Sequence, residues 1–312
     1  MKTMKAVSIY KYGGPDVLVY EDAPRPHPGE GETLIRVHAA GINPVDWKIR
    51  EGHLREMLNH TFPLVLGWDV SGVVEALGAG VKRFKVGDEV FSRPDISRDG
   101  AYAEYIVVRE SELALKPKTL DHIHAASLPL AGLTAWQTLF DAGGLSSGQR
   151  VLIHGAAGGV GHIAVQLAKW KGAHVIGTAS EKNHDFLRHL GVDQVIAYQT
   201  VRFEEAVEPV DVVLDTMGGE VQARSWKVLR RGGILVSIAS PPSEEAAAAN
   251  GVRQAFVFTQ PNAPQLEEIA RLADAEKLKA IVETILPLSD AKRGQELSQR
   301  GHTRGKIVLR VV

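Results

Sequence analysis

The glycine-rich segment at residues 155–161 restricts the possible folds more than any other feature of this 312-residue chain. The segment reads Gly-Ala-Ala-Gly-Gly-Val-Gly. It lies between an apolar, strand-like run at residues 151–154 and a helical pattern that continues to about residue 171. Such a turn exposes backbone N–H groups at the positive end of the helix. An ordinary tight turn is the alternative, but the strand–turn–helix order favours a site for the pyrophosphate of a dinucleotide.

Small residues occupy the three fingerprint positions of this segment, namely Ala156, Gly158 and Gly161. Gly158 lets the backbone approach the pyrophosphate, and Gly161 lets the helix pack closely on the sheet. Alanine replaces the usual first glycine, which is acceptable where the turn needs no positive φ. The loop residues predicted to contact the cofactor are Ala157, Gly158, Gly159 and Val160.

Strand-like and helical segments alternate after about residue 149, which predicts a parallel sheet with right-handed crossovers. The expected strands are residues 151–154, 174–178, 194–197, 210–215, 233–238 and 252–258. Helices are expected at residues 125–142, 185–190 and 265–282.

The first 120 residues contain short alternating or β-branched runs separated by Gly- and Pro-rich turns, which predicts a compact β barrel or sandwich. The expected strands are residues 6–10, 33–39, 70–77, 89–91 and 103–108. A strand at residues 306–312 is expected to return to this domain, and Tyr102 and Tyr105 are expected to hold it together.

The end of the second strand of the parallel sheet indicates which dinucleotide is bound. NAD-preferring sites place Asp or Glu there to bind the ribose 2′-hydroxyl, whereas this strand ends Thr178-Ala179 without an acid. The hydroxyl, ammonium and amide groups that follow suit a 2′-phosphate, so NADP is predicted. Capping of the next helix is the alternative role for two of these residues, Ser180 and Asn183. The full set predicted to hold the phosphate is Ser180, Lys182, Asn183 and Tyr198.

The composition disfavours several other classes of protein. The net charge is −1, so no basic excess indicates a nucleic-acid or anionic-membrane partner. No apolar run approaches the ~20 residues of a membrane span, and residues 1–10 lack a secretory pattern, which favours the cytoplasm. The chain has 0 cysteines, so it forms no disulfide and no thiolate metal site.

Residues 148–169 resemble the signature segment of quinone oxidoreductases and zeta-crystallin, which belong to the medium-chain dehydrogenase/reductase superfamily. The resemblance depends on Leu152, the loop at 156–161, Gln166 and Lys169, and it extends to residues 41–48, 129–135 and 305–309. Residues 43–48 are especially similar to the chloroplast-envelope branch of these proteins.

The resemblance implies an α/β protein with two domains. A GroES-like β-barrel catalytic domain is expected at residues 1–124 and 266–312. A Rossmann domain, with a doubly wound parallel sheet that binds the cofactor, is expected at residues 125–265.

Zinc alcohol dehydrogenases of this superfamily bind their catalytic metal through a cysteine and a Gly-His-Glu motif. Asn43 stands at the cysteine position here, and the motif reads Gly67-Trp68-Asp69, so only Asp69 remains as a ligand. A catalytic zinc needs about three protein ligands, so no metal site is expected. Without a Lewis acid, we expect acceptors that take hydride readily, such as quinones and conjugated carbonyls.

Three residues are candidate catalytic groups near the expected nicotinamide. Asn43 is expected to bond the carboxamide or a substrate oxygen, or else to serve only as a turn residue before Pro44. Lys48 is a candidate electrophile or proton donor for developing enolate charge, or else a solvated surface lysine. Trp68 is expected to line the substrate pocket, or else to be a core aromatic. Asp46 is expected to bond locally.

The resemblance also implies cofactor contacts in other segments. Thr134 lies on the helix expected after residue 125, where a hydroxyl bonded to the backbone is the alternative. Phe258 has core or dimer packing as its alternative. With Asn43, the full set in these segments is Thr134, Asp215, Thr216, Ala239, Phe256, Phe258 and Lys306.

These features predict an NADPH-dependent, zinc-independent oxidoreductase that transfers hydride to a small quinone or related conjugated carbonyl. A reductase of enal or enone double bonds and a non-catalytic NADPH-binding or sensor protein remain alternatives, while a zinc alcohol dehydrogenase is disfavoured. The resemblance implies a homodimer, in which the strand at residues 252–258 extends the sheet between subunits.

Overall fold

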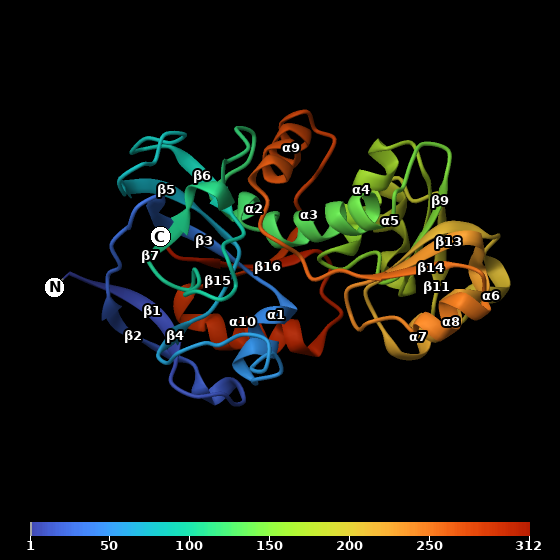
Figure 1. Ribbon diagram of the computed structural model, residues 1–312, viewed down its shortest axis with the longest axis horizontal. Coiled ribbons are helices and arrows are strands. Elements are labelled where there is room, and N and C mark those ends of the chain that lie inside the picture. The colour runs from blue at the N-terminus through green and yellow to red at the C-terminus, as the bar shows by residue number, and fades with distance from the viewer. Residues whose placement is uncertain (1) are drawn as a thin grey trace. The chain divides into compact units, whose positions relative to one another are not determined.

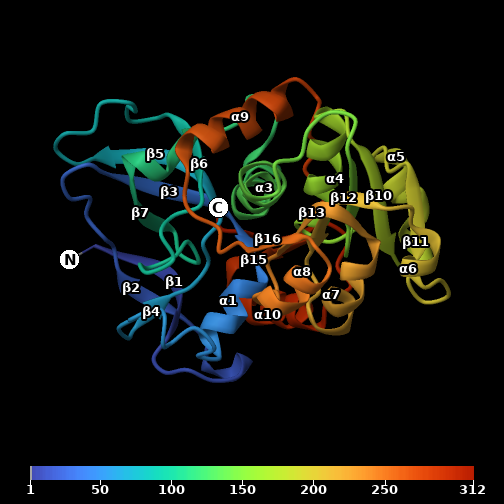
Figure 2. The same cartoon turned by 45° about the vertical axis from the view of Figure 1, so that its right-hand side comes forward.

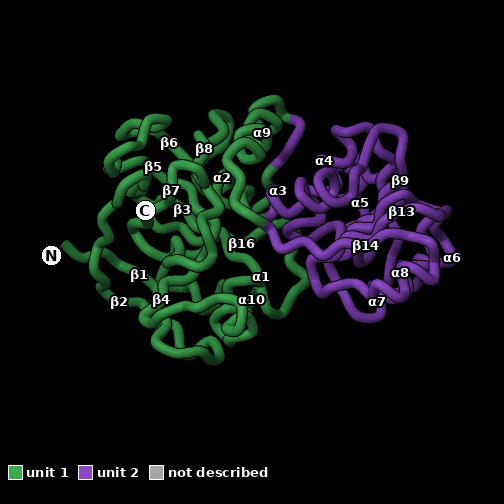
Figure 3. The backbone as a smooth tube through the Cα atoms, viewed as in Figure 1, with its two compact units in different colours: residues 1–130, 260–276, 280–312 green, residues 131–259, 277–279 purple. Residues whose placement is uncertain are grey.

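The computed structural model describes residues 2–312, so Met1, the first residue of the segment inspected for a secretory signal, lies outside the described residues. The chain forms two compact units, which Figure 3 shows in different colours. Unit 1 comprises residues 1–130, 260–276 and 280–312, and unit 2 comprises residues 131–259 and 277–279. The sequence placed the corresponding boundaries near residues 125 and 265.

Unit 1 is built mainly from antiparallel sheet (Figure 1). One sheet has the strand order β2-β1-β4, and a larger one has the order β15-β16-β3-β5-β6-β8, with β7 also paired to β3. The strands are β1 (Thr3–Ile9), β2 (Val19–Pro24), β3 (Glu32–Ile42), β4 (Leu64–Val65), β5 (Val70–Leu77), β6 (Glu89–Ser92), β7 (Tyr105–Arg109), β8 (Leu113–Leu115), β15 (Val282–Pro287) and β16 (Lys306–Arg310).

The last strand of the chain returns to this unit, as the sequence predicted. In β16, Ile307 pairs with Ile42 of β3 in antiparallel register, and both side chains are buried. This pairing brings the start of β16 next to the end of β3. The helices of unit 1 are α1 (Pro44–Arg50), α2 (His122–Ala125), α9 (Ala263–Asp274) and α10 (Ala291–Arg300), with 3-10 turns at Pro15–Val17, Glu110–Glu112 and Leu288–Asp290.

Unit 2 contains a parallel sheet with the strand order β11-β10-β9-β12-β13-β14, which is the doubly wound order of dinucleotide-binding folds. Each strand matches a run that the sequence predicted. The strands are β9 (Arg150–Ile153), β10 (His174–Ala179), β11 (Gln194–Ala197), β12 (Val210–Asp215), β13 (Leu229–Ser237) and β14 (Arg253–Phe256).

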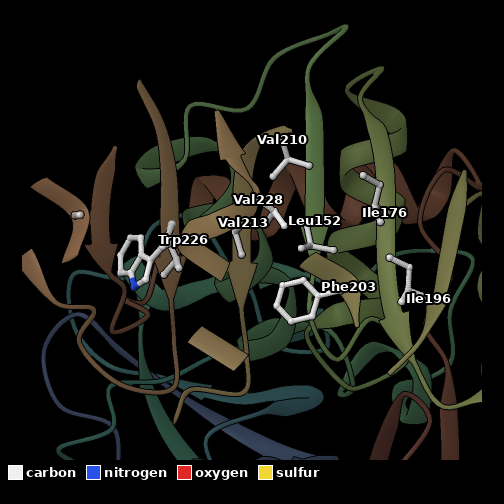
Figure 4. Close-up of a cluster of buried hydrophobic side chains, with 10 residues drawn as sticks. Leu152, Ile176, Ile196, Phe203, Val210, Val213, Trp226 and Val228 are labelled. Carbon is white, nitrogen blue, oxygen red and sulfur yellow. The ribbon is translucent and has the colours of Figure 1, made fainter. Parts of the chain in front are cut away.

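Helices cover both faces of this sheet because its strands are apolar on both sides. Leu152, Ile176 and Val213 project from three strands into one core, where the rings of Phe203 and Trp226 pack against them (Figure 4). Helices α4 and α5 pack against β9, β10 and β11 (Figure 2). The helices are α3 (Pro129–Trp136), which begins in unit 1, a π-helix (Gln137–Ala142), α4 (Gly161–Trp170), α5 (His184–His189), α6 (Phe203–Ala206), α7 (Gly219–Ser225) and α8 (Glu244–Ala249), with 3-10 turns at Glu181–Asn183 and Trp226–Val228.

Two expected helices differ from the structure. The helix expected at residues 265–282 is wrong at its end, because α9 stops at Asp274, Glu276 takes a positive φ of 55°, and Val282 starts strand β15. The helix expected at residues 125–142 is interrupted, since α2 ends at Ala125 and α3 begins at Pro129. A proline restricts the residue before it to extended backbone, which accounts for this interruption.

Candidate functional site

The glycine loop of unit 2 connects β9 to α4. Gly155 has a φ of +63°, a conformation that glycine adopts without strain, whereas Ala156 is not among the residues with positive φ. A Cβ on Gly161 would lie 2.2 Å from the carbonyl oxygen of Gly155 and 2.7 Å from the Cα of Ala156. Gly161 is therefore required by close packing at the helix start, as the sequence predicted.

The middle of the loop leaves room and donors for a ligand. A Cβ on Gly158 would meet only the carbonyl oxygen of Gly155, at 3.3 Å, a tight contact that a shift of a few tenths of an ångström would relieve. Among residues 2–312, the N–H groups of Ala157, Gly159 and Val160 donate to no protein acceptor. Free N–H groups at the start of α4, beside a glycine, fit the pyrophosphate of a dinucleotide.

The buried side chain of His154 lies beside the start of the glycine loop. The hydroxyl of Thr178 lies 3.1 Å from Nδ1 of His154 and 3.4 Å from the N–H of Gly155, and Oγ of Ser225 lies 2.9 Å from Nε2. The Ser225 hydroxyl donates to the Val221 carbonyl, so it accepts from Nε2–H of the imidazole. Burial lowers the pKa of His154 to about 4, so the ring is neutral with its proton on Nε2.

The residues predicted to hold a 2′-phosphate gather at one edge of the sheet. Ala179 of β10 pairs with Ala197 of β11, so Ser180 and Tyr198 follow adjacent strand ends. Lys182 and Tyr198 are exposed, while Asn183 is buried and donates from Nδ2 to Oγ of Ser180 at 3.1 Å. Neither Ser180 nor Asn183 makes a side-chain capping bond to the helix that follows.

Two of the predicted cofactor residues, Asp215 and Thr216, lie at the end of β12, and Thr216 contacts the loop. Asp215 is buried, and its carboxylate accepts from the N–H groups of Met217 and Gly218, which shapes the turn after β12. The hydroxyl of Thr216 donates to the carbonyl of His154 at 2.8 Å, and the same hydroxyl would be 2.6 Å from a Cβ on Gly155. This edge is the one where open α/β folds bind ligands.

The remaining residues predicted from these segments have different surroundings. A Cβ on Gly218 would be 3.2 Å from the Cβ of Ala239. Phe256 is 40% exposed at the end of β14, and Phe258 is half-buried. Thr134 is buried, and its hydroxyl lies 2.7 Å from that of Thr259.

A buried polar cluster in unit 1 contains Asn43, Asp69 and Lys306. The amide of Asn43 donates to Oδ2 of Asp69 at 2.8 Å. The ammonium of Lys306 donates to the Ile42 carbonyl, to Oδ1 of Asn43 and to Oδ2 of Asp69. Burial raises the pKa of Asp69, and the charge of Lys306 opposes that rise. Lys306 thus uses its three N–H donors within unit 1, and a contact with a cofactor stays a prediction.

Asp46 lies beside this cluster at the start of α1. Its Oδ2 accepts from the N–H of Asn43 at 2.8 Å and from the Tyr102 hydroxyl at 2.6 Å. Burial raises the pKa of Asp46 to about 7. The local bonding expected for Asp46 and the structural role expected for Tyr102 are both confirmed by these contacts.

The other two candidate catalytic residues lie in contrasting surroundings. Trp68 is 0% exposed, and its indole N–H donates to the carbonyl of Arg98 at 3.0 Å, which is the core position that the sequence left open as an alternative. Lys48 is half-buried on α1, with its ammonium 5.8 Å from the ring centroid of Trp47. Their contacts with a substrate stay predictions.

Sequence reasoning identified Asn43 and Asp69 but missed the buried ion pair that joins Asp69 to Lys306. A lysine at the start of an apolar strand was the available signal, because a buried ammonium needs acceptors. It also missed His154 and Arg93, both buried. Within residues 2–312, no three His, Asp or Glu side chains gather as metal ligands.

No helix in the described part of the chain is long and apolar enough to cross a bilayer.

Comparison with known proteins extends over the whole chain. Residues 29–118 match the family model of the alcohol dehydrogenase GroES-like domain, and residues 190–309 match that of a zinc-binding dehydrogenase. Human "NAD(P)H oxidoreductase RTN4IP1, mitochondrial" is 36% identical over 99% of this chain and 89% of its own length. The spinach "Quinone-oxidoreductase homolog, chloroplastic" is 33% identical over 99% of this chain and 98% of its own.

A solved structure gives the same result. The quinone oxidoreductase from Coxiella burnetii superposes with a TM-score of 0.91 at 39% identity and covers 100% of both chains. Together with the GroES-like unit 1, the Rossmann-like unit 2 and the glycine loop, these similarities show that the chain belongs to the medium-chain dehydrogenase/reductase superfamily, in the zinc-independent, quinone oxidoreductase-like branch.

Proposed function

We propose that this oxidoreductase uses NADPH, without zinc, to reduce quinones or related conjugated carbonyl compounds. The observation that carries the proposal is the glycine loop, where the N–H groups of Ala157, Gly159 and Val160 lie beside Gly158 and donate to no acceptor within residues 2–312. Bound NADPH would supply the hydride. The names of the human and spinach relatives agree with a nicotinamide cofactor and a quinone acceptor.

The preference for NADPH depends on the edge formed by β10 and β11. There the ammonium of Lys182 and the hydroxyl groups of Ser180 and Tyr198 suit the 2′-phosphate. The side-chain amide of Asn183 donates a hydrogen bond to the Ser180 hydroxyl. The further cofactor contacts are those proposed from the sequence, namely Asn43, Thr134, Asp215, Thr216, Ala239, Phe256, Phe258 and Lys306.

The chemical step is assigned to groups of unit 1. Asn43 orients the carboxamide or the acceptor, while the full burial of Trp68 favours its alternative role as a core aromatic. Lys48 stabilises the developing enolate charge or donates the proton that follows hydride transfer. The domain division proposed from the sequence, with residues 125–265 holding the cofactor, places these groups in the catalytic domain.

The proposal is tested by fluorescence titration of the purified protein with NADPH and NADH, followed by NADPH oxidation with a panel of quinones, enones and simple aldehydes. We expect tighter binding of NADPH and turnover of the conjugated acceptors alone. Equal affinity for both nucleotides would remove the 2′-phosphate assignment. Binding without turnover of any acceptor would favour the non-catalytic alternative.

A matched pair of glycine variants tests the loop. Gly158→Val places its side chain where the pyrophosphate would lie, so NADPH affinity should fall by about 100-fold or more. Gly14→Val serves as the control, because a Cβ on Gly14 meets nothing within 4 Å and its φ is −66°. Unchanged NADPH binding by Gly158→Val would refute the placement of the cofactor.

We also propose a cytoplasmic homodimer. Edge strand β14 would carry the sheet from one subunit to the other. The names of the human and spinach relatives, which are mitochondrial and chloroplastic, argue against a cytoplasmic location. Fractionation of cells that express the tagged full chain would decide the location.

A further inference from the structure

Arg93 is a buried cation that the protein leaves without a partner. The residue follows β6 in unit 1 and is 3% exposed. Its Nε is buried with no hydrogen-bond partner, and no hydrogen bond or ion pair of the described residues involves its guanidinium. A desolvated charge costs free energy unless it is paired, so an unpaired buried guanidinium requires an explanation.

The acids around Arg93 accept hydrogen bonds from other donors. Three carboxylates act on its charge, those of Asp69, Asp95 and Glu112. Both oxygens of each carboxylate accept hydrogen bonds from other groups. Asp69 accepts from Lys306, Asn43 and the Leu130 N–H. Asp95 accepts from Ser97 and Arg109, and Glu112 accepts from Arg109 and the Asp95 N–H. Their charges act on Arg93, but none of the three carboxylates accepts a hydrogen bond from its guanidinium in the described residues.

Another buried arginine of unit 1 shows how the chain treats a structural guanidinium. Arg50 is 0% exposed, and its nitrogens donate to the Gly13 carbonyl, Gln295 and Glu51. All three side-chain nitrogens of Arg50 thus donate hydrogen bonds, while no hydrogen bond of the described residues involves the Arg93 guanidinium. The difference indicates that the acceptor for Arg93 comes from outside the chain.

The position of Arg93 links it to the proposed chemistry. In the antiparallel register of β5 and β6, Val70 pairs with Ser92, which places Asp69 and Arg93 at neighbouring positions just beyond the ends of the two strands. Asp69 holds the amide of Asn43. Arg93 therefore lies at the same end of the barrel as the residue assigned to the cofactor and acceptor.

We propose that Arg93 binds the acceptor oxygen that gains negative charge during reduction, an assignment that rests on the proposed function. When hydride adds to the β-carbon of an enone, the C=C π electrons move to form the enolate, and its oxygen takes the charge. The guanidinium stabilises that oxygen through fixed N–H donors. Because an arginine keeps its proton, the proton that completes the reduction comes from Lys48 or from water.

The test combines Arg93→Ala with chemical rescue. We expect kcat/KM for an enone or quinone to fall by about 100-fold or more, which is typical for the loss of one oxyanion donor. NADPH affinity, measured by fluorescence titration, should stay unchanged because the cofactor loop lies in unit 2. Free guanidinium ion, below concentrations that unfold the protein, should restore part of kcat/KM, whereas tetramethylammonium at equal ionic strength should not.

Two further variants complete the design. Arg55→Ala removes an exposed arginine of the same unit, paired only with its neighbour Glu56 at 3.8 Å, and should leave kcat/KM unchanged. Arg93→Lys keeps the stem and the charge and provides a folded comparison if the alanine variant unfolds; it should retain more activity than Arg93→Ala.

The outcomes separate this proposal from the proposed function. If the unmodified protein reduces no acceptor, both are overturned. If it is active and the Arg93 variants keep wild-type kcat/KM, only the Arg93 assignment fails. A loss of activity that guanidinium does not restore would make Arg93 a structural residue and would also overturn the assignment.

Discussion

Lys306 carries the buried ion pair of unit 1, and its removal is the most direct test of the polar cluster. Lys306→Met keeps the apolar stem but leaves Oδ2 of Asp69 and Oδ1 of Asn43 without their ammonium donor. Breaking one side of a buried pair typically costs about 3–5 kcal/mol. We expect a loss of that size in the free energy of unfolding, measured by urea denaturation.

Lys292→Met is the matched control for this prediction. Lys292 also pairs with an acid, Asp16, but 48% of the Lys292 side chain and 90% of the Asp16 side chain are exposed. Exposed pairs contribute about 0–1 kcal/mol, so the control should hardly change stability. Equal effects of the two substitutions would show that Lys306 is not a buried structural cation.

Asp46 gives a pH-dependent prediction. Burial raises its pKa from 3.8 to about 7 in the folded chain. Between these values the folded state keeps a proton that the unfolded chain releases, so the contribution of Asp46 to stability falls as the pH rises from about 4 to about 7. Asp46→Asn cannot titrate and should lack this slope, which reaches about 1.4 kcal/mol per pH unit.

The measurement is the free energy of unfolding of both proteins at several pH values across that window. The difference between Asp46→Asn and the unmodified protein should grow in favour of the variant as the pH rises. Asp16→Asn is the control, because Lys292 lowers the pKa of Asp16 and places its titration below the window. Parallel curves for Asp46→Asn and the unmodified protein would contradict the raised pKa.

For single residues, the sequence predicted which residues belong to the site better than it predicted which side chains they contact. Motif spacing identified Asn43 and Asp69, but the contact of Asn43 with Lys306 joins residues 263 positions apart and exists only because β16 pairs with β3. Arg93 was missed for the same reason. Nothing local distinguishes it, and two of the nearby acids, which bond Arg109 and Lys306, come from other parts of the sequence.

Among the elements, the turn from β9 to α4 (residues 155–161) contains one glycine assigned to packing, Gly161, and one assigned to cofactor binding, Gly158. Gly161→Ala would place a Cβ 2.2 Å from the carbonyl oxygen of Gly155, so the start of α4 and the loop must move apart. Overpacking of this kind typically costs about 1–3 kcal/mol. We expect that loss in the stability of the protein without cofactor, measured by chemical denaturation.

Gly158→Ala should behave in the opposite way. Its Cβ meets one atom at 3.3 Å, so stability without cofactor should change by less than about 1 kcal/mol, while NADPH affinity should fall. Loss of stability in Gly158→Ala, with none in Gly161→Ala, would invert the roles assigned to the two glycines.

The sequence predicted the strands of unit 2 closely because each is a short apolar run bounded by turn residues. It predicted the helix at residues 265–282 poorly. The apolar periodicity continues past Asp274, but Leu278, at 2% exposure, is buried without belonging to a helix, and the backbone has already turned at Glu276. Periodicity reports which side chains are buried, and tertiary contacts decide where a helix ends.

For the whole molecule, the alternation of segments predicted the parallel sheet, and the family resemblance implied the two domains and the doubly wound sheet. Association between copies is a further question at this scale, because a sheet edge offers unpaired N–H and C=O groups. In the described sheet of unit 2, β14 is an edge strand, and Phe256 on it is 40% exposed.

Gln254→Pro tests whether this edge joins two subunits. The N–H of Val257 donates inward to the Ser237 carbonyl at 2.9 Å, and backbone direction alternates along a strand, so the N–H of Gln254 faces outward. Proline there removes an outward donor and leaves the pairing with β13 intact. Light scattering should give twice the chain mass for the unmodified protein and for Gln254→Ala, which keeps its N–H, but a single chain mass for Gln254→Pro. A dimer that survives the proline would contradict an interface through this edge, because the proline removes a donor from the middle of β14.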